Sequence, residues 1–245
     1  GEAKYADIVE LVLYNSALSG ISVTGKEYFY ANPLRMLKNT RDYNAHENVT
    51  ETPNREPYLS CFCCPPNLVR TIATVSEWAY SLAENGVTVN LYGANNLDTQ
   101  LKDGSPIKVA QETEYPWQGK VKLIVKECKE DAFSISLRIP KWAKNSKLTL
   151  NGEEISNTLK PGSFTLIERN WKKGDILVLN MPMEVDFIEG HPRIEEVRNQ
   201  IAIKRGPIVY CIESPDLPKD TDILDIYFNG NKKLEPKYKP NFLGG

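Results

Sequence analysis

Three of the chain's five cysteines fall within four positions, at Cys61, Cys63 and Cys64. The other two, Cys128 and Cys211, lie far away along the sequence. Ordinary core packing spreads thiols over a chain, whereas a nucleophile or a metal site needs several of them at one point. The cluster is therefore the first place in this sequence to look for chemistry.

The residues after the cluster predict how its thiols are held. Pro65 and Pro66 fix their own backbone torsions, and Asn67 is expected to cap a helix, because apolar residues follow it at helical spacing to about Leu82. The thiols would then lie at a helix N-terminus, where the helix dipole favours the thiolate form. Arg70, in the first turn, adds positive charge. A thiolate is both a nucleophile and a zinc ligand.

Two interpretations of the cluster stay open on the residues alone. One is a set of buried structural thiols; the other, which we favour, is a metal site built partly from Cys63 and Cys64. Disulfides are disfavoured, because neighbouring cysteines rarely pair and five thiols leave one over. Common structural zinc patterns use two separated ligand pairs, and here no second pair exists, since His46 and His191 are isolated. The missing ligands would be carboxylates or lie outside this chain.

Composition narrows the class of protein. The chain has 245 residues, a formal net charge of −2 and 41% hydrophobic residues, which suffices for one large domain or two smaller ones. Near-neutral charge argues against a nucleic-acid partner. No apolar run approaches the roughly 20 residues that span a bilayer, so we expect no membrane segment. No signal peptide is visible, but the N-terminus resembles the interior of a domain, so the compartment, cytoplasmic or periplasmic, stays unassigned.

The first 85 residues predict helices joined by loops. Residues 3–20 have the periodicity of an amphipathic helix, whose carboxylates Asp7 and Glu10 are expected on a solvent-exposed face. Aromatic residues at 28–34 predict a short strand, and polar residues at 38–60 predict a long loop that leads to the cysteines. This region is predicted as one domain, 1–85.

From residue 86 the sequence predicts a mainly β fold. In 133–139 apolar residues alternate with polar ones, as in a strand with one solvent-facing side. About ten short strands between turns predict an antiparallel β-sandwich over 86–215, followed by a linker and tail over 216–245. Trp117, Trp142 and Trp171 would pack at its edge or, alternatively, form a carbohydrate platform. The predicted strands are 87–92, 107–113, 120–126, 133–139, 147–150, 163–168, 176–181, 184–188, 200–204 and 207–213, with 223–228 a candidate for one more.

The cysteine motif resembles that of a known family. Cys63-Cys64-Pro65-Pro66-Asn67, with Arg70 three places on, resembles the signature of glycoside hydrolase family 127 and its relative family 146, the β-L-arabinofuranosidases. The cysteine motif is specific, and the resemblance extends over residues 1 to about 213. Three further segments support the resemblance. A late barrel helix of that family is similar to Tyr5-Ala6-Asp7 with Glu10 and Tyr14-Asn15, and its tyrosine-bearing strand is similar to Phe29-Tyr30-Ala31-Asn32-Pro33-Leu34. Its β-sandwich is similar to Trp171-Lys172-Lys173-Gly174-Asp175 and Lys204-Arg205-Gly206-Pro207-Ile208-Val209-Tyr210.

The resemblance implies a fold and a set of roles. The fold would be an antiparallel β-sandwich preceded by the last helices of an (α/α)6 barrel. Cys63 would be the nucleophile of a retaining mechanism, Cys63 and Cys64 would bind Zn²⁺, and Tyr30 would contact the sugar. In the family, the other two zinc ligands, a Glu and a Cys two residues apart, and the acid/base Glu come earlier in the catalytic domain. Cys61 receives no role.

This sequence departs from the pattern because no Glu-x-Cys pair precedes its cysteine motif. We therefore expect the C-terminal part of a glycoside hydrolase that acts on an arabinose-containing glycan or oligosaccharide, inactive as these 245 residues alone. Barrel helices without their neighbours would expose apolar surface, which would pack on the strands or on another copy in a homo-oligomer. The alternatives are a non-catalytic carbohydrate-binding β-sandwich with structural thiols and a zinc-stabilised interaction module.

Overall fold

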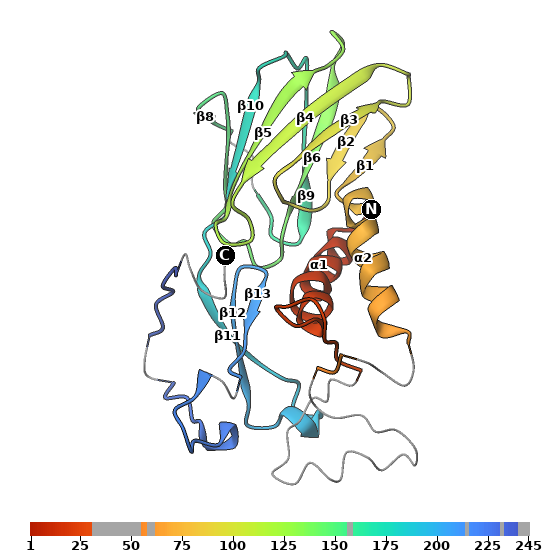
Figure 1. Ribbon diagram of the computed structural model, residues 1–245. Helices are drawn as coiled ribbons and strands as arrows, with labels where there is room; N and C mark the ends of the chain where they lie inside the picture. The colour runs from red at the N-terminus through yellow and green to blue at the C-terminus, as the bar shows by residue number, and fades with distance from the viewer. Residues whose placement is uncertain (31–54, 58–61, 156–158, 214–215, 231–232, 240–245) are drawn as a thin grey trace. The chain divides into compact units, whose positions relative to one another are not determined.

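The computed structural model describes residues 1–30, 55–57, 62–155, 159–213, 216–230 and 233–239 (Figure 1). Three β-sheets and few helices make up these residues, which confirms the prediction of a mainly β fold. The chain divides into two compact units, one of Gly1–Leu13 with Ile72–Glu184 and the other of Tyr14–Thr71 with Val185–Gly245. Each unit is described by itself. The three predicted domain ranges stay a prediction.

A four-stranded sheet belongs to the first unit, in the order β1-β2-β6-β9. The pairing of β2 with β6 is parallel and the other two pairings are antiparallel, so the prediction of antiparallel pairing is wrong at this one position. A hairpin cannot make a parallel pair, and the chain completes three strands of another sheet between β2 and β6. The strands are β1 (Tyr80–Ala83), β2 (Gly86–Val89), β6 (Phe133–Ile139) and β9 (Ser163–Arg169).

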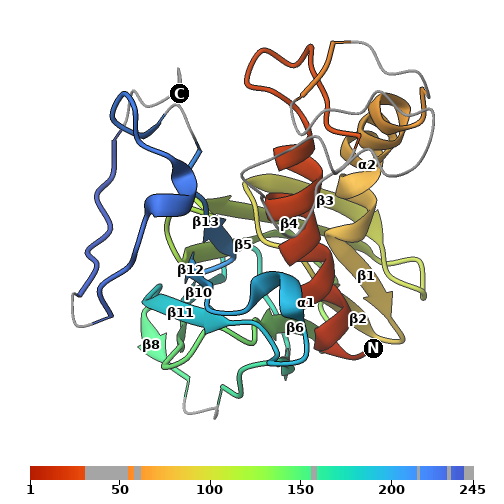
Figure 2. The same ribbon diagram turned by 90° about the horizontal axis from the view of Figure 1, so that it is seen from below.

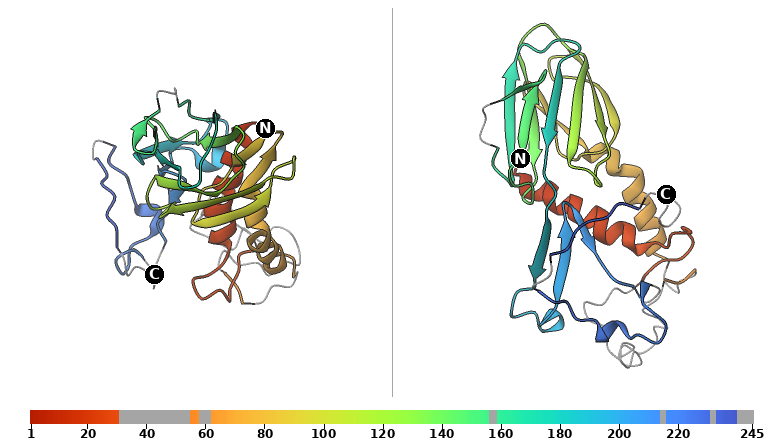
Figure 3. Two further views of the ribbon diagram at one scale, coloured as in Figure 1. Left: turned by 90° about the horizontal axis from the view of Figure 1, so that it is seen from above. Right: turned by 90° about the vertical axis from the view of Figure 1, so that its left-hand side faces the viewer.

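A six-stranded sheet completes the strands of the first unit, in the order β3-β4-β5-β10-β7-β8, and all of its pairings are antiparallel. The views in Figure 3 show these strands and those of the four-stranded sheet gathered in one group. The strands are β3 (Asn95–Gln100), β4 (Pro106–Thr113), β5 (Lys120–Glu127), β7 (Lys147–Leu150), β8 (Glu153–Glu154) and β10 (Ile176–Asn180).

The core of the first unit draws apolar side chains from both sheets. Ile135 and Leu137 on β6 are fully buried, as are Ile107 on β4 and Leu179 on β10. Trp171 is buried with them, and its indole N–H donates a hydrogen bond to the backbone oxygen of Phe133 at 2.9 Å. Burial of these side chains is the main favourable contribution to the stability of this unit.

Strand β6 is buried on both of its faces, so the prediction of one solvent-facing side is wrong. Its polar residues Ser134, Ser136 and Arg138 are all buried. At Arg138 the cause is α1 (Ala3–Val12), which lies next to the four-stranded sheet (Figures 1 and 2), contacts β9 and pairs two carboxylates with the guanidinium. Near the other end of β6, the Ser134 hydroxyl donates to the backbone oxygen of Asn85.

Two helical segments accompany the sheets. After α1 the chain continues through a π-helical turn, η1 (Leu13–Ala17), and a 3-10 turn, η2 (Leu18–Gly20). The second helix, α2 (Cys64–Trp78), ends earlier than the predicted Leu82. Residues Tyr80–Ala83 pair with Gly86–Val89 as a hairpin instead, so strand pairing overrides the helical periodicity there.

The second unit contains a three-stranded antiparallel sheet in the order β11-β12-β13 (Figure 2). Its strands are β11 (Val185–Glu189), β12 (Ile201–Arg205) and β13 (Ile208–Tyr210). A 3-10 turn, η4 (Glu195–Val197), lies between β11 and β12. The candidate strand at 223–228 is wrong, because a 3-10 turn, η6 (Ile223–Asp225), forms there, capped by the Asp222 carboxylate on the Leu224 N–H at 2.8 Å.

The π-helical turn is joined to the edge of this sheet by one side chain. The amide of Asn15 donates to the backbone oxygen of Pro207 at 2.8 Å and accepts from the backbone N–H of Val209 at 2.7 Å. The side chain therefore pairs with β13 much as a neighbouring strand would.

Across the described residues, none of the helices combines the length and the apolar character needed to cross a bilayer.

Candidate active site at the cysteine turn

The two adjacent cysteines lie where α2 begins. The backbone N–H of Asn67 donates to the oxygen of Cys63 at 3.1 Å, which closes the first turn of the helix, and Cys64 is the first helical residue. The helix thus begins three residues before Asn67, the residue predicted to cap it. Pro65 and Pro66 fall in the first turn, where N–H groups have no intrahelical partner and a missing N–H therefore costs nothing.

The thiols of Cys63 and Cys64 lie close together and are not joined in a disulfide. Cys63 is exposed, Cys64 is half-buried, and their sulfurs lie 3.7 Å apart, too far for a disulfide. Two sulfurs bound to one tetrahedral zinc, each at about 2.3 Å, lie about 3.8 Å apart. The pair is therefore spaced as two ligands of one zinc ion would be.

The rest of a metal site does not appear among the described residues, which contain no group of three or more His, Cys, Asp and Glu side chains that could hold a metal ion. Cys61 and His46 lie outside the described residues. The fit to zinc thus rests on the two thiols and their spacing.

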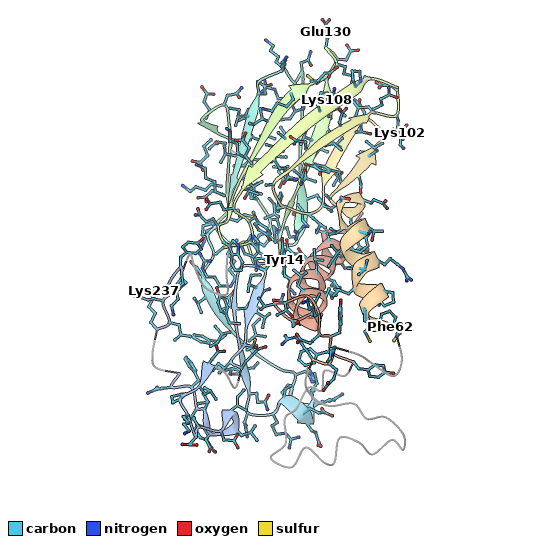
Figure 4. The ribbon with its side chains drawn as sticks, viewed as in Figure 1. Tyr14, Phe62, Lys102, Lys108, Glu130 and Lys237 are labelled. Atoms are coloured by element: carbon cyan, nitrogen blue, oxygen red, sulfur yellow. The ribbon has the colours of Figure 1, made fainter. Side chains whose placement is uncertain are left out.

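Phe62, Arg70 and Tyr30 complete the description of the residues around the predicted site. Phe62 precedes the thiols with 64% of its surface exposed, at the end of the chain segment that enters α2 in Figure 4. Arg70 is exposed on α2. Tyr30 is 40% exposed, and its contact with a sugar stays a prediction.

The segment that leads to Tyr30 is held by its own contacts. Tyr28 forms isolated β-bridges with Ile21 and Glu56, and the guanidinium of Arg55 lies 4.4 Å from the centre of the Phe29 ring. Residues 31–34 of the strand predicted at 28–34 lie outside the described residues.

Sequence reasoning missed one cluster of charged side chains. Asp7 and Glu10 were expected on a solvent-exposed face of α1, yet Glu10 is 3% exposed and both carboxylates form ion pairs with the buried Arg138. The available signal was an arginine in the middle of a strand whose other side is apolar, together with two carboxylates three residues apart on a helix.

The tryptophans of the first unit bear on the carbohydrate-platform alternative. Trp142 stacks on Tyr115 with ring centres 6.4 Å apart and donates to Glu10, and Trp171 is 2% exposed, so both pack internally. Trp117 is 55% exposed. A platform built from all three rings is excluded by this arrangement.

Comparison with known proteins gives one consistent family. The β-L-arabinofuranosidase GH127 catalytic domain matches residues 1–77, the GH127 middle domain matches 86–183, and the glycoside hydrolase family 127 C-terminal domain matches 185–243. The cysteine turn falls within the first of these matches. Together they define one family of glycoside hydrolases, whose domain models follow one another along this chain in the order catalytic, middle and C-terminal.

Individual relatives agree. The non-reducing end β-L-arabinofuranosidase of Bifidobacterium longum subsp. longum is 33% identical over 227 residues, covering 89% of this chain and 33% of that protein. A solved GH127 β-L-arabinofuranosidase from Geobacillus stearothermophilus T6 is 36% identical with a TM-score of 0.87, covering 98% of this chain and 37% of its own. A second solved structure, titled a glycoside hydrolase, is 45% identical with a TM-score of 0.81, covering 91% of this chain and 36% of its own.

The chain belongs to glycoside hydrolase family 127. It spans about a third of the length of the relatives it matches.

Proposed function

We propose that this chain is part of a retaining β-L-arabinofuranosidase in which Cys63 is the nucleophile and an arabinose-containing glycan is the substrate. The observation that carries the proposal is the pair of adjacent thiols, with sulfurs 3.7 Å apart, at the start of α2, within the residues that match the family's catalytic domain. The names of the Bifidobacterium and Geobacillus relatives supply the substrate class.

The proposed chemistry follows from the position of the thiol. Cys63 is exposed just before the first turn of α2, so its sulfur is accessible to a substrate. Its sulfur would attack the anomeric carbon, and the bond to the leaving oxygen would break as a carboxylic acid protonates that oxygen. Water would then displace the thiolate while the same carboxylate accepts a proton, so two inversions retain the configuration. Tyr30 would contact the sugar.

Zn²⁺ is the proposed cofactor, held by Cys63 and Cys64. When bound, it would keep both thiols deprotonated near neutral pH and fix their direction. The remaining ligands and the acid/base Glu would come from outside these 245 residues, and we propose that the chain alone does not turn over substrate. The structure of the whole would be an (α/α)6 barrel, of which α1 and α2 are late helices, followed by a β-sandwich made of the four- and six-stranded sheets.

Two measurements test the proposal. Zinc per chain and reactive thiols are counted in the 245-residue protein, where we expect no tightly held zinc and reactive thiols at Cys63 and Cys64. Tightly held zinc in this chain would contradict the proposal that the remaining zinc ligands come from outside it.

Turnover is then measured in a polypeptide that joins these residues to the rest of a family 127 catalytic domain. Cys63→Ser should lower the turnover of a β-L-arabinofuranoside by about a thousandfold or more, because the nucleophile is lost. Cys211→Ser, at another exposed thiol, serves as the matched control and should leave turnover unchanged. Full turnover by Cys63→Ser would show that the nucleophile is assigned wrongly.

A further inference from the structure

Helix α1 buries its charged side and exposes its apolar side. Glu10 is 3% exposed, whereas Tyr5 is 61% and Ile8 57% exposed. A helix on the surface of a globular domain ordinarily does the reverse. The buried carboxylate of Glu10 therefore needs partners from the strands of its unit.

A single guanidinium makes the central contacts. Arg138, on β6, is fully buried; one terminal nitrogen lies 2.5 Å from the Asp7 carboxylate and the other lies 2.5 Å from the Glu10 carboxylate. Its Nε–H donates to the backbone oxygen of Asn90 at 2.5 Å. The planar guanidinium thus bonds the Asn90 backbone through one nitrogen and contacts the two α1 carboxylates through the other two. A lysine, with a single nitrogen, cannot reproduce this geometry.

The carboxylates have further donors. The Tyr115 hydroxyl donates to Glu10 at 2.6 Å, and the Trp142 indole N–H donates to its other oxygen at 3.3 Å. The backbone N–H of Lys141 donates to the second oxygen of Asp7 at 3.2 Å. All four carboxylate oxygens are therefore paired. Burial alone would lower the pKa of Arg138, but the Glu10 carboxylate raises it above its ordinary value, so the guanidinium stays charged.

These contacts cross a boundary between family domains. Asp7 and Glu10 fall in the catalytic-domain match, whereas Arg138, Tyr115 and Trp142 fall in the middle-domain match. The compact unit nevertheless joins Gly1–Leu13 with Ile72–Glu184. We infer that Arg138 is a positioning residue through which the middle domain holds helix α1 of the catalytic domain, by way of Asp7 and Glu10. This inference requires only the domain matches and the buried contacts, and it stands apart from the cysteine and zinc chemistry.

The test is hydrogen–deuterium exchange along α1 in the 245-residue chain. In Arg138→Met two buried carboxylates lose their cation, so backbone amides of α1 should exchange about a hundredfold faster or more and should stay less protected than those of the six-stranded sheet. Lys108→Met is the matched control, because Lys108 (labelled in Figure 4) also contacts two carboxylates but has an exposed side chain. It should leave α1 unchanged. Wild-type exchange in α1 of Arg138→Met would overturn the inference.

A second variant keeps the test decisive if the strands of Arg138→Met fail to fold. The double change Asp7→Asn with Glu10→Gln removes both charges from the helix and leaves the bond from Arg138 to Asn90 in place. Faster exchange confined to α1 supports the inference, and wild-type exchange there overturns it. Arg138→Lys should give an intermediate rate, and a rate equal to that of Arg138→Met would overturn the ion-pair explanation.

Discussion

Two cations of the middle domain each contact two carboxylates, yet their surroundings are opposite. The Arg138 side chain is fully buried beside Asp7 and Glu10. The Lys108 side chain is 42% exposed, with its nitrogen 3.3 Å from Asp98 and 3.2 Å from Glu127. An exposed pair contributes little because water and salt screen it, whereas a buried charge that loses its partner is strongly destabilising. The number of ion pairs therefore says little about their importance.

The two cations also connect different parts of the chain. Asp98 and Glu127 stand directly opposite Lys108 on β3 and β5, so its contacts repeat the register that the backbone already fixes. Arg138 lies more than a hundred residues from its partners, on a different element. Only Arg138 adds a connection that no strand pairing supplies.

The largest effect is expected for Arg138→Met. Removing the cation leaves two carboxylates without their buried partner, so the free energy of unfolding should fall by about 3–5 kcal/mol. Denaturant unfolding followed by tryptophan fluorescence measures it. A loss below about 1 kcal/mol would mean that the cluster behaves like an exposed pair.

Tyr115→Phe should have the next largest effect. The change removes a hydroxyl that donates to the Glu10 carboxylate from a residue that is 7% exposed. Hydrogen bonds to charged groups contribute about 1.5–3 kcal/mol, and the same unfolding experiment should show a loss of that size. Tyr227→Phe, at a ring that is 88% exposed, is the control and should change nothing.

Asp175 tests a buried carboxylate whose hydrogen-bond donors are neutral, with the Arg169 guanidinium farther away at 3.9 Å. Burial raises its pKa, but hydrogen bonds from the Asn151 side chain and the Lys172 backbone N–H hold that pKa below its ordinary value. Because the folded pKa is the lower one, the stabilisation is present above about pH 4 and is lost as the pH falls through the folded pKa.

Asp175→Asn should therefore lower the free energy of unfolding by about 1 kcal/mol at pH 7. The difference from the wild type should shrink as the pH falls below about 4. A difference that stays constant down to strongly acidic pH would refute the role of the charge.

Lys108→Met should have the smallest effect. Hydrogen bonds with Glu127 and Asp98 raise the pKa of Lys108, so its pairs are intact below about pH 10.5 and are lost as the pH rises through the folded pKa. Because the group is exposed, we expect no measurable change in the denaturant midpoint at pH 7, at low or high salt. A clear, salt-dependent fall in the denaturant midpoint would show that the exposure of a cation does not predict how much it contributes to stability.

Much of the fold could be predicted because alternation is a local signal. The strands at 120–126 and 133–139 were placed to within a residue of β5 and β6. The predictions that were wrong are those that placed the polar faces of a helix and a strand in contact with solvent. Asp7 and Glu10 on α1 and Arg138 on β6 each indicate solvent when taken alone, but they form ion pairs with one another. No local pattern reveals that two polar surfaces are mutual partners.

The candidate site shows the same division. The cysteine cluster and a helix after it follow from residues that are neighbours in the sequence, and the structure places Cys63 and Cys64 at the start of α2. The helix start was placed four residues too late, at the residue after the predicted cap Asn67, because prolines were expected to precede the helix, whereas they occupy its first turn. Ligands contributed from distant positions carry no local signature, since only the fold brings them together.

The Asn15 side chain at the π-helical turn has a consequence for solubility. Strand β13 is the last of its sheet, and a free strand edge is a template on which another chain can add a strand and begin an aggregate. By occupying the Pro207 oxygen and the Val209 N–H, Asn15 removes the hydrogen-bonding groups on both sides of Ile208 from that edge. A single side-chain amide thus shields this edge of the sheet, at Ile208, from foreign strands without the chain having to supply a further strand of its own there.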